Sequence, residues 1–295
     1  MIISVSRRCD IPRFFFDWFL ERLDAGFVDV KNPFNANQIR HVSLAPADDD
    51  TVFAFWTRDP ASILEHAEEL ESRGCRFYVM CTLTGYPALL EPNMPSSPEV
   101  IQLMAALAGK ITPDRVIWRY DPVFLSNLTD FEFHRVNFSS LAERLKGVVR
   151  RVIVSVYDEY PRAEKRLDLL ESTNSLKRMA HYDGAASGKK TLTPMVRGLL
   201  ADMANIAGSK GMEIQSCAES ELSDCKQSTD CLQSEDCGIK PGACIDGEYI
   251  SKTFGIVAPG KDRFKKRPGC LCCQSVDIGT YGQCKAGCVY CYASS

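Results

Sequence analysis

Three cysteines near the end of the chain have a spacing that suits metal or iron–sulfur chemistry. Cys284, Cys288 and Cys291 form a C-x3-C-x2-C pattern on a loop that contains Gly287. Three thiolates can hold three corners of a cubane [4Fe-4S] cluster and leave one iron open for a small ligand. Zinc also suits thiolates, but a closed structural zinc site takes four protein ligands, so the fourth would come from elsewhere. The spacing therefore predicts an open iron–sulfur site, with zinc as the main alternative.

Most of the other cysteines are concentrated in the same part of the chain. The chain has 14 cysteines, and eleven of them lie at or after position 217. We group four of these as a closed site: Cys217, Cys244, Cys270 and Cys272. Four thiolates predict either a second [4Fe-4S] cluster for electron delivery or a structural zinc. The others form a third site or are surplus loop thiols: Cys225, Cys231, Cys237 and Cys273.

Three cysteines precede this tail, and we expect them to be small buried hydrophobic residues: Cys9, Cys75 and Cys81. Cys9 follows two arginines, whose positive charge favours a thiolate.

Composition restricts the class of protein. The chain has 295 residues, of which 45% are hydrophobic and 25% charged, with a formal net charge of −3. This charge makes nucleic-acid binding unexpected, since such binding usually needs a basic face. We find neither a membrane-spanning apolar stretch nor a signal peptide. Cysteines at this density without a secretory signal predict a reducing cytoplasm and metal ligation instead of disulfides.

The elements that must position these thiols alternate between strands and helices. Short β-branched runs predict seven barrel strands, at 2–5, 27–30, 51–56, 76–84, 115–120, 151–157 and 212–216, with a short antiparallel piece at 39–44. Helices are expected between them, starting near residues 12, 60, 98, 129, 161 and 194. This pattern predicts an α/β fold, a TIM-like (β/α) barrel or partial barrel over residues 1–216. Residues 217–295 then form a cysteine-rich iron–sulfur module that caps the barrel mouth.

Polar residues follow the predicted strands, at the face of a barrel where active sites lie. Arg7 and Arg8 follow the first strand, and Arg119 and Asp121 lie at the end of the fifth. We predict catalytic roles for these four residues. Arg119 could also grip a carboxylate of a cofactor or substrate, although an internal Arg119–Asp121 ion pair is an equal alternative. Two further cofactor-binding residues are predicted at the end of the second strand, Lys31 and Asn32.

The C-terminal pattern resembles the cluster motif of the radical S-adenosylmethionine (SAM) enzymes, C-x3-C-x-aromatic-C. In that family SAM binds the open iron, and the aromatic residue packs near the adenine, which implies cofactor binding by Tyr290. The family carries its motif after the first strand, whereas here only four residues follow Cys291.

The whole chain also resembles an uncharacterised family, DUF1848, that has a C-terminal cysteine cluster. The matching segments begin at Ser4, Lys31, Phe55, Leu83, Trp118, Ala243 and Asp277. The resemblance supports the inclusion of Cys244 and the Cys270-x-Cys272 pair in the closed site, and it implies no reaction.

These observations favour a radical SAM-type enzyme, an oxidoreductase, lyase or transferase that cleaves SAM at the open cluster. We expect a small-molecule or peptide substrate, and a reductant such as ferredoxin or flavodoxin. One alternative is an iron–sulfur electron-transfer protein without SAM chemistry. Another is a barrel enzyme with structural zinc.

Overall fold

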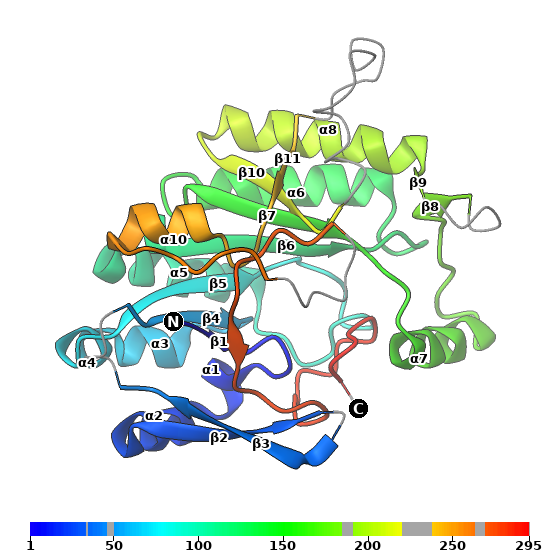
Figure 1. Cartoon of the computed structure of the whole chain (residues 1–295). Helices are drawn as coiled ribbons and strands as arrows, with labels where there is room; N and C mark the ends of the chain where they lie inside the picture. The colour runs from blue at the N-terminus through cyan, green and yellow to red at the C-terminus, as the bar shows by residue number, and fades with distance from the viewer. Residues whose placement is uncertain (34, 46–49, 185–190, 220–237, 263–268, 295) are drawn as a thin grey trace.

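The computed structural model describes residues 1–295 except 34, 46–49, 185–190, 220–237, 263–268 and 295. Within these residues the chain is an α/β protein built on one large parallel sheet (Figure 1).

The central sheet has eight parallel strands in the order β11-β10-β7-β6-β5-β4-β1-β12. In chain order they are β1 (Ile2–Val5), β4 (Val52–Thr57), β5 (Arg76–Thr82), β6 (Val116–Val123), β7 (Arg151–Val156), β10 (Glu213–Cys217), β11 (Lys240–Gly242) and β12 (Val276–Asp277). β4 is buried at every position, because a strand inside a parallel sheet is covered on both faces.

The predicted alternation of strands and helices and the parallel sheet are confirmed, but a closed barrel is not. Within the described ranges the sheet stays open, with β11 and β12 as its two edges. Both edge strands come from the tail after residue 217, so the tail continues the sheet on both sides. The predicted division at residue 217 stays a prediction.

The prediction that residues 27–30 form the second barrel strand is wrong, because this strand pairs elsewhere. β2 (Phe27–Asn32) pairs antiparallel with β3 (Asn35–Ser43) and lies outside the central sheet. Val28 is buried while Asp29 and Lys31 are exposed, a one-sided burial that suits a hairpin better than the interior of a parallel sheet.

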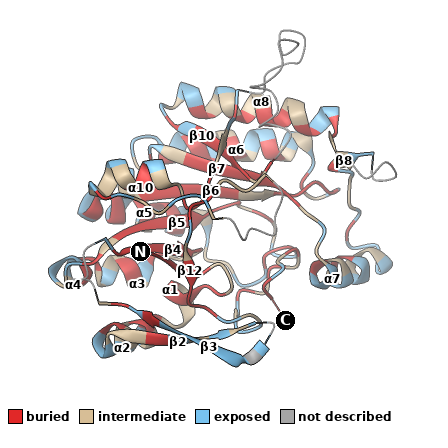
Figure 2. Ribbon diagram, viewed as in Figure 1, coloured by how far each residue is buried: buried red, intermediate tan, exposed pale blue. Residues whose placement is uncertain are grey.

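The described helices are α1 (Ile11–Phe14), α2 (Phe16–Ala25), α3 (Ala61–Glu65), α4 (Ala67–Ser72), α5 (Ser97–Ile111), α6 (Phe131–Leu145), α7 (Pro161–Ser172), α8 (Pro194–Ser209) and α10 (Gly247–Phe254), with a 3-10 turn at Pro113–Arg115 and a small β8 (Tyr182–Asp183) and β9 (Thr191–Leu192) hairpin. Helices α1 to α6 and α8 contribute to the core on one face of the central sheet, and α10 packs on the other face. α2, α5, α6 and α8 bury their apolar sides against the strands (Figure 2). None of the described helices has both the length and the apolar character needed to cross a bilayer.

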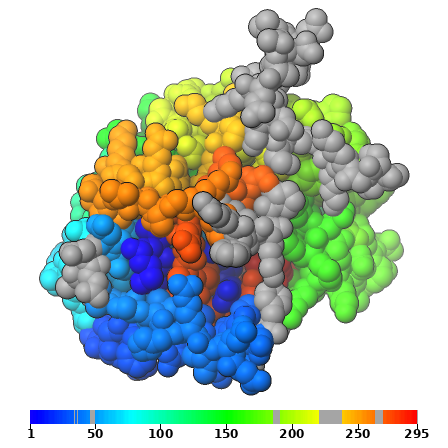
Figure 3. Space-filling view, viewed as in Figure 1, coloured from blue at the N-terminus to red at the C-terminus, as the bar shows by residue number. Residues whose placement is uncertain are grey.

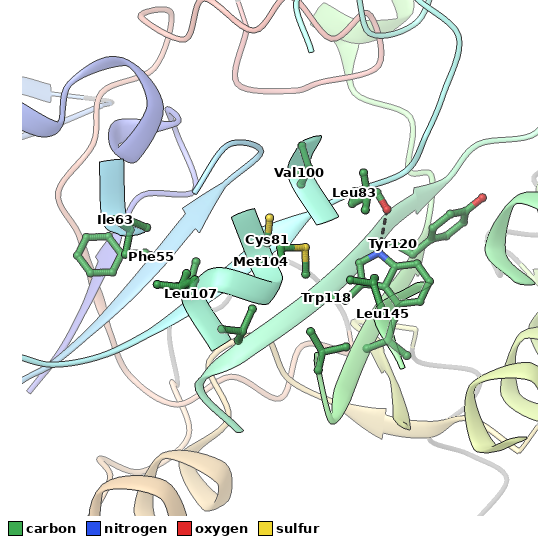
Figure 4. Close-up of a cluster of buried hydrophobic side chains, with 14 of the residues drawn as sticks. Phe55, Ile63, Cys81, Leu83, Val100, Met104, Leu107, Trp118, Tyr120 and Leu145 are labelled. Carbon is green, nitrogen blue, oxygen red and sulfur yellow. Dashed lines mark hydrogen bonds between the residues drawn. The ribbon is translucent and has the colours of Figure 1, made fainter. Parts of the chain in front are cut away.

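The core on the helical face is densely packed around β5 and β6 (Figure 4). The indole of Trp118 donates a hydrogen bond to the Leu83 carbonyl at 2.8 Å and stacks on Phe138 with ring centroids 4.8 Å apart. The bond satisfies the indole N–H, so this large aromatic side chain can be fully buried.

The opposite face of the sheet is covered by the tail. Ile2, Ala54 and Met80 pack there against Ile245 and Ile250, the latter from α10. In Figure 3 tail residues (orange) cover part of the surface turned to the viewer, and C-terminal residues (red) are visible below them. The tail is therefore part of the same fold as the strands.

Two buried histidines must be neutral in the folded protein. The Nε2 of His181 accepts the Leu125 amide N–H at 2.7 Å. His134 donates from Nε2 to the Phe124 carbonyl at 3.1 Å, which leaves Nδ1 to accept the Tyr120 hydroxyl at 2.8 Å. Burial lowers the pKa of each imidazole from 6.5 to about 4.

We predict that folding stability falls as the pH is lowered from 6.5 to 4, because the unfolded chain binds more protons in this window. The contribution of the two histidines to the free energy of unfolding is fully present above pH 6.5. It falls by about 1.4 kcal/mol per pH unit for each histidine as the pH is lowered towards 4. Denaturant unfolding at several pH values measures this slope. His181→Gln should reduce the slope of the free energy of unfolding against pH, and substitution of the exposed His41 by Gln should leave it unchanged. Equal slopes in the wild type and both variants would show that the buried histidines do not cause the pH dependence.

Candidate functional site

A single cavity of about 320 Å3 brings together the chain segments that follow the parallel strands. Residues after β1, β4, β7 and β10 line it, with the end of β6 and parts of the tail. Carboxyl ends of parallel strands meet at one edge of a sheet, where ligands bind in α/β proteins. The lining residues from the strand ends include Ser6, Arg7, Arg8, Cys9, Trp56, Thr82, Arg119, Asp121, Ser155 and Asp158.

The three C-terminal cysteines all line this cavity. The sulfur of Cys291 accepts the Ala293 N–H at 3.3 Å. The pKa of Cys284 is lowered to about 6, chiefly by a hydrogen bond from the Cys9 side chain. The structure therefore gathers the three predicted thiols around one cavity, with a backbone donor bonded to Cys291.

A tight turn, together with hydrogen bonds from one arginine to three loop carbonyls, fixes the position of the C-terminal loop. Gly287 has a φ of +75°, and a Cβ there would lie 3.2 Å from both Asn93 and Pro92, so any other residue would be strained at this position. Arg166 of α7 donates to the carbonyls of Val289 at 3.0 Å, of Ser294 at 3.4 Å and of Cys291. In Figure 1 this loop (red) lies between α1 and α7.

A buried charged cluster lies beneath the loop. Arg58 donates to Glu91 at 2.8 Å and to the Tyr290 hydroxyl at 2.8 Å, and that hydroxyl donates to Glu91. Burial raises the pKa of the Cys288 thiol to about 12, while the positive charge of Arg58 opposes the shift. Arg58 therefore supplies positive charge next to the thiols with only 13% of its side chain exposed.

Tyr290 is held on the sheet side of the loop. Its ring lies between Phe124 and Tyr86, with centroids 5.9 Å away in each case, and it is 5% exposed. Its hydroxyl is bonded to Arg58 and Glu91. Tyr290 lines the cavity, but most of its surface contacts protein.

The four cysteines of the predicted closed site also line the cavity. The sulfurs of Cys217 and Cys244 lie 2.9 Å apart, and the side chains of Cys270 and Cys272 are hydrogen-bonded to each other. Cys273 is buried next to them without lining the cavity. The remaining tail cysteines, 225, 231 and 237, lie outside the described residues.

The cysteines of these two groups do not converge on a point. Across the part of the chain that the structure describes, no set of three or more His, Cys, Asp and Glu side chains is arranged to hold a single metal ion. The two groups are spread around one cavity, with the closed-site cysteines beside α10 and the C-terminal three beside α1 and α7.

Arg7 and Arg8 line the cavity but also pair with a buried carboxylate. Their Nε atoms lie 3.5 Å and 3.8 Å from the carboxylate of Asp277 in β12. That carboxylate also accepts hydrogen bonds from Ser4 and Ser6 at 2.9 Å and 2.5 Å. The two arginines therefore help fix the end of β1 against β12.

Arg119 and Asp121 form the internal ion pair that the sequence left open as an alternative. Arg119 also stacks over Trp56, with its guanidinium carbon 4.6 Å from the ring centroid. Asp121 further accepts a hydrogen bond from Ser155. Both charged residues face the cavity, so the pair is compatible with a ligand contact.

The other predicted cofactor-binding residues lie elsewhere. Lys31 and Asn32 are in the β2–β3 hairpin and are not among the residues that line the cavity. Asn32 donates to Gln38 at 2.8 Å across the hairpin, and Lys31 is exposed. Their predicted role stays a prediction.

Two residues of the site were not singled out from the sequence. Glu91 lies in a proline-containing loop, and Arg166 lies within α7. No local pattern marks either, because each acts through contacts with a segment more than 100 residues away. Arg58 directly follows β4 and belongs to the polar strand ends that the pattern did identify.

Comparisons with known proteins support the family resemblance. The family model described as "Domain of unknown function (DUF1848)" matches residues 2–293. No curated protein is significantly similar in sequence. A solved structure of the tandem GH20 catalytic modules of a pneumococcal exo-β-D-N-acetylglucosaminidase matches at 8% identity with a TM-score of 0.26. The match covers 74% of this chain and 53% of that one, about half its length, and similarity at that level establishes neither fold nor activity.

We predict that Arg166→Ala loosens the C-terminal loop, because three carbonyls lose a charged donor. Hydrogen bonds to a charged group contribute about 1.5–3 kcal/mol. Amide hydrogen exchange of residues 284–294 should become faster, while the central sheet stays protected. Arg162→Ala, an exposed arginine on the same helix, is the control; equal exchange in the two variants would show that Arg166 does not hold the loop.

Proposed function

The chain belongs to the DUF1848 family, whose description carries no activity, and from its cavity we propose that it is a radical SAM-type iron–sulfur enzyme. The observation that carries this proposal is the placement of Cys284, Cys288 and Cys291. All three line one cavity together with Arg119 and Asp121, at the carboxyl edge of a parallel sheet. In the proposed architecture the sheet is a partial barrel, and the cysteine-rich tail caps its mouth.

The donor set fits an iron–sulfur cluster at the C-terminal loop. Cys284, Cys288 and Cys291 supply thiolates, and the Ala293 backbone N–H already donates to the Cys291 sulfur. Such donors, together with the charge of Arg58, stabilise thiolates that carry negative charge. When bound and reduced, a [4Fe-4S] cluster with one open iron supplies the electron that cleaves SAM.

The chain's own residues position ligands and exclude water. Arg119 donates to anionic groups, such as a carboxylate of SAM or of the substrate, and Asp121 fixes its orientation. Arg7 and Arg8 add positive charge at the rim, where Asp277 holds them. The packed C-terminal loop and the tail keep water away from the inner wall of the cavity.

The second cysteine group supports electron delivery. Cys217, Cys244, Cys270 and Cys272 line the same cavity, and the Cys217 and Cys244 sulfurs are 2.9 Å apart. We assign them to an auxiliary [4Fe-4S] cluster, with structural zinc as the alternative. The external reductant is a ferredoxin- or flavodoxin-like protein of a reducing cytoplasm.

One observation favours a different function, iron–sulfur electron transfer without SAM chemistry. The Tyr290 ring is enclosed by Phe124 and Tyr86, and its hydroxyl is already bonded. A tyrosine held in this way has little surface left for an adenine ring. In the electron-transfer alternative Tyr290 only anchors the loop.

The test is SAM cleavage by the anaerobically reconstituted protein. With dithionite and SAM, the wild-type protein should produce 5′-deoxyadenosine, and Cys288→Ala should produce none. Cys75→Ala removes a buried thiol of the core and should keep the activity. Cluster formation without 5′-deoxyadenosine would favour electron transfer, and stoichiometric zinc without acid-labile sulfide would favour the structural-zinc alternative.

A further inference from the structure

Helix α7 carries positive charge on one of its sides. Arg162 and Lys165 are exposed, and Arg166 is partly buried. Residues three and four apart lie on the same side of a helix, so these three side chains form one basic face. Across the part of the chain that the structure describes, Arg162 and Lys165 have no ion-pair or hydrogen-bond partner. Their charges are therefore available to a binding partner.

The acidic residues of α7 lie on a different side of the helix and are already paired. Arg178, in the segment after the helix, forms ion pairs of 2.5–2.6 Å with three carboxylates, those of Glu164, Asp168 and Glu171. These residues follow one another at intervals of four and three, which keeps them together on their own side of the helix. They therefore do not neutralise the basic face.

The basic face borders a surface recess next to the C-terminal segment. Five residues line this recess: Arg162, Lys165, Arg166, Tyr281 and Gly282. The Gly282 amide donates to the Ala293 carbonyl at 3.1 Å, and the ring centroids of Tyr281 and Tyr292 lie 6.3 Å apart. Tyr292 and Ala293 line the main cavity, so the recess and the cavity lie on either side of this segment.

Arg166 connects the recess to the cysteine loop. Its guanidinium donates to the carbonyl oxygens of Val289 and Cys291. Cys291 is one of the three thiols of the proposed cluster site, and in Figure 1 α7 lies directly beside this loop (red). A donor bound at the recess is therefore separated from Cys291 by the side chain of Arg166.

Charge and apolar surface together indicate the kind of partner. The chain has a formal net charge of −3, so a local basic face attracts an acidic protein while much of the remaining surface repels it. Leu169 lies one turn beyond Lys165 on the same side of α7 and is 66% exposed. An exposed leucine beside the charges suits a protein interface, which combines apolar contacts with a polar rim. A small anion would use the charges alone.

We propose that the basic face of α7, formed by Arg162, Lys165 and Arg166, is the docking site of an acidic protein that donates single electrons to the C-terminal cluster. This inference rests on the proposed function. It applies equally to the electron-transfer alternative, because both need an external reductant. In each encounter one electron leaves the reduced cofactor of the partner and enters the oxidised cluster, and no bond forms or breaks.

The test is the rate at which an acidic flavodoxin in its reduced form reduces the anaerobically reconstituted protein, followed by flavin absorbance in stopped flow. Arg162→Glu combined with Lys165→Glu should slow this reduction about tenfold at low ionic strength, because attraction becomes repulsion. Arg166 is kept, since it holds the loop. The matched control is Arg144→Glu combined with Lys146→Glu, two exposed residues at the end of α6 that precede the amino end of β7. It changes the net charge equally and should react as wild type.

Four outcomes would overturn the proposal, and iron content shows whether each protein holds a cluster. Equal rates in wild type and the Arg162 and Lys165 variant overturn the docking site but leave the proposed function standing. A wild-type rate that does not fall as sodium chloride is raised overturns it even if the variant does not fold. Stronger inhibition by inorganic phosphate than by sodium chloride at equal ionic strength would assign the recess to a small anion instead. A wild-type protein that binds no iron overturns the proposed function together with this inference.

Discussion

The arrangement of the site depends on the buried carboxylate of Asp277. It joins β12 to β1 by accepting hydrogen bonds from Ser4, Ser6 and the Arg7 amide, and it is 7% exposed. Gly279 makes this contact possible, because any Cβ there would collide with Ser6. A buried carboxylate is costly unless its acceptor positions are filled, so the pairing of β12 with β1 is strongly specified. The C-terminal loop follows directly and is thereby brought to the carboxyl edge of the sheet.

Two electrostatic environments meet in the resulting cavity. The C-terminal thiols lie near Arg58, whose charge is shared with Glu91, while the closed-site thiols lie nearer Arg7 and Arg119. Each arginine is paired with a carboxylate, so the cavity gains donors without a large net charge. Negatively charged clusters in these positions would be stabilised by the arginines, which supports the proposed redox role.

Local patterns were enough for most of the secondary structure before residue 217 and for the identity of the thiols, but not for α10, the two edge strands or the partners of the thiols. Buried apolar runs such as β4 and capped helices such as α5, where Ser96 accepts the Glu99 amide, are encoded by neighbouring residues. The β2–β3 pairing and the open sheet depend on which segments meet, and the two edge strands are only two and three residues long. The hydrogen bond of Arg166 with the loop and that of Tyr290 with Glu91 join positions more than 100 residues apart. Neither spacing nor periodicity encodes such contacts.

The central claim is that the C-terminal thiols hold a cluster whose fourth iron accepts SAM inside this cavity. EPR spectroscopy of the reduced, anaerobically reconstituted protein, with and without SAM, tests it most directly. The account predicts that SAM changes the g-values of one cluster signal and that this signal is absent from Cys288→Ala. A cluster spectrum that SAM leaves unchanged, or a SAM-sensitive signal that persists in Cys288→Ala, would contradict it.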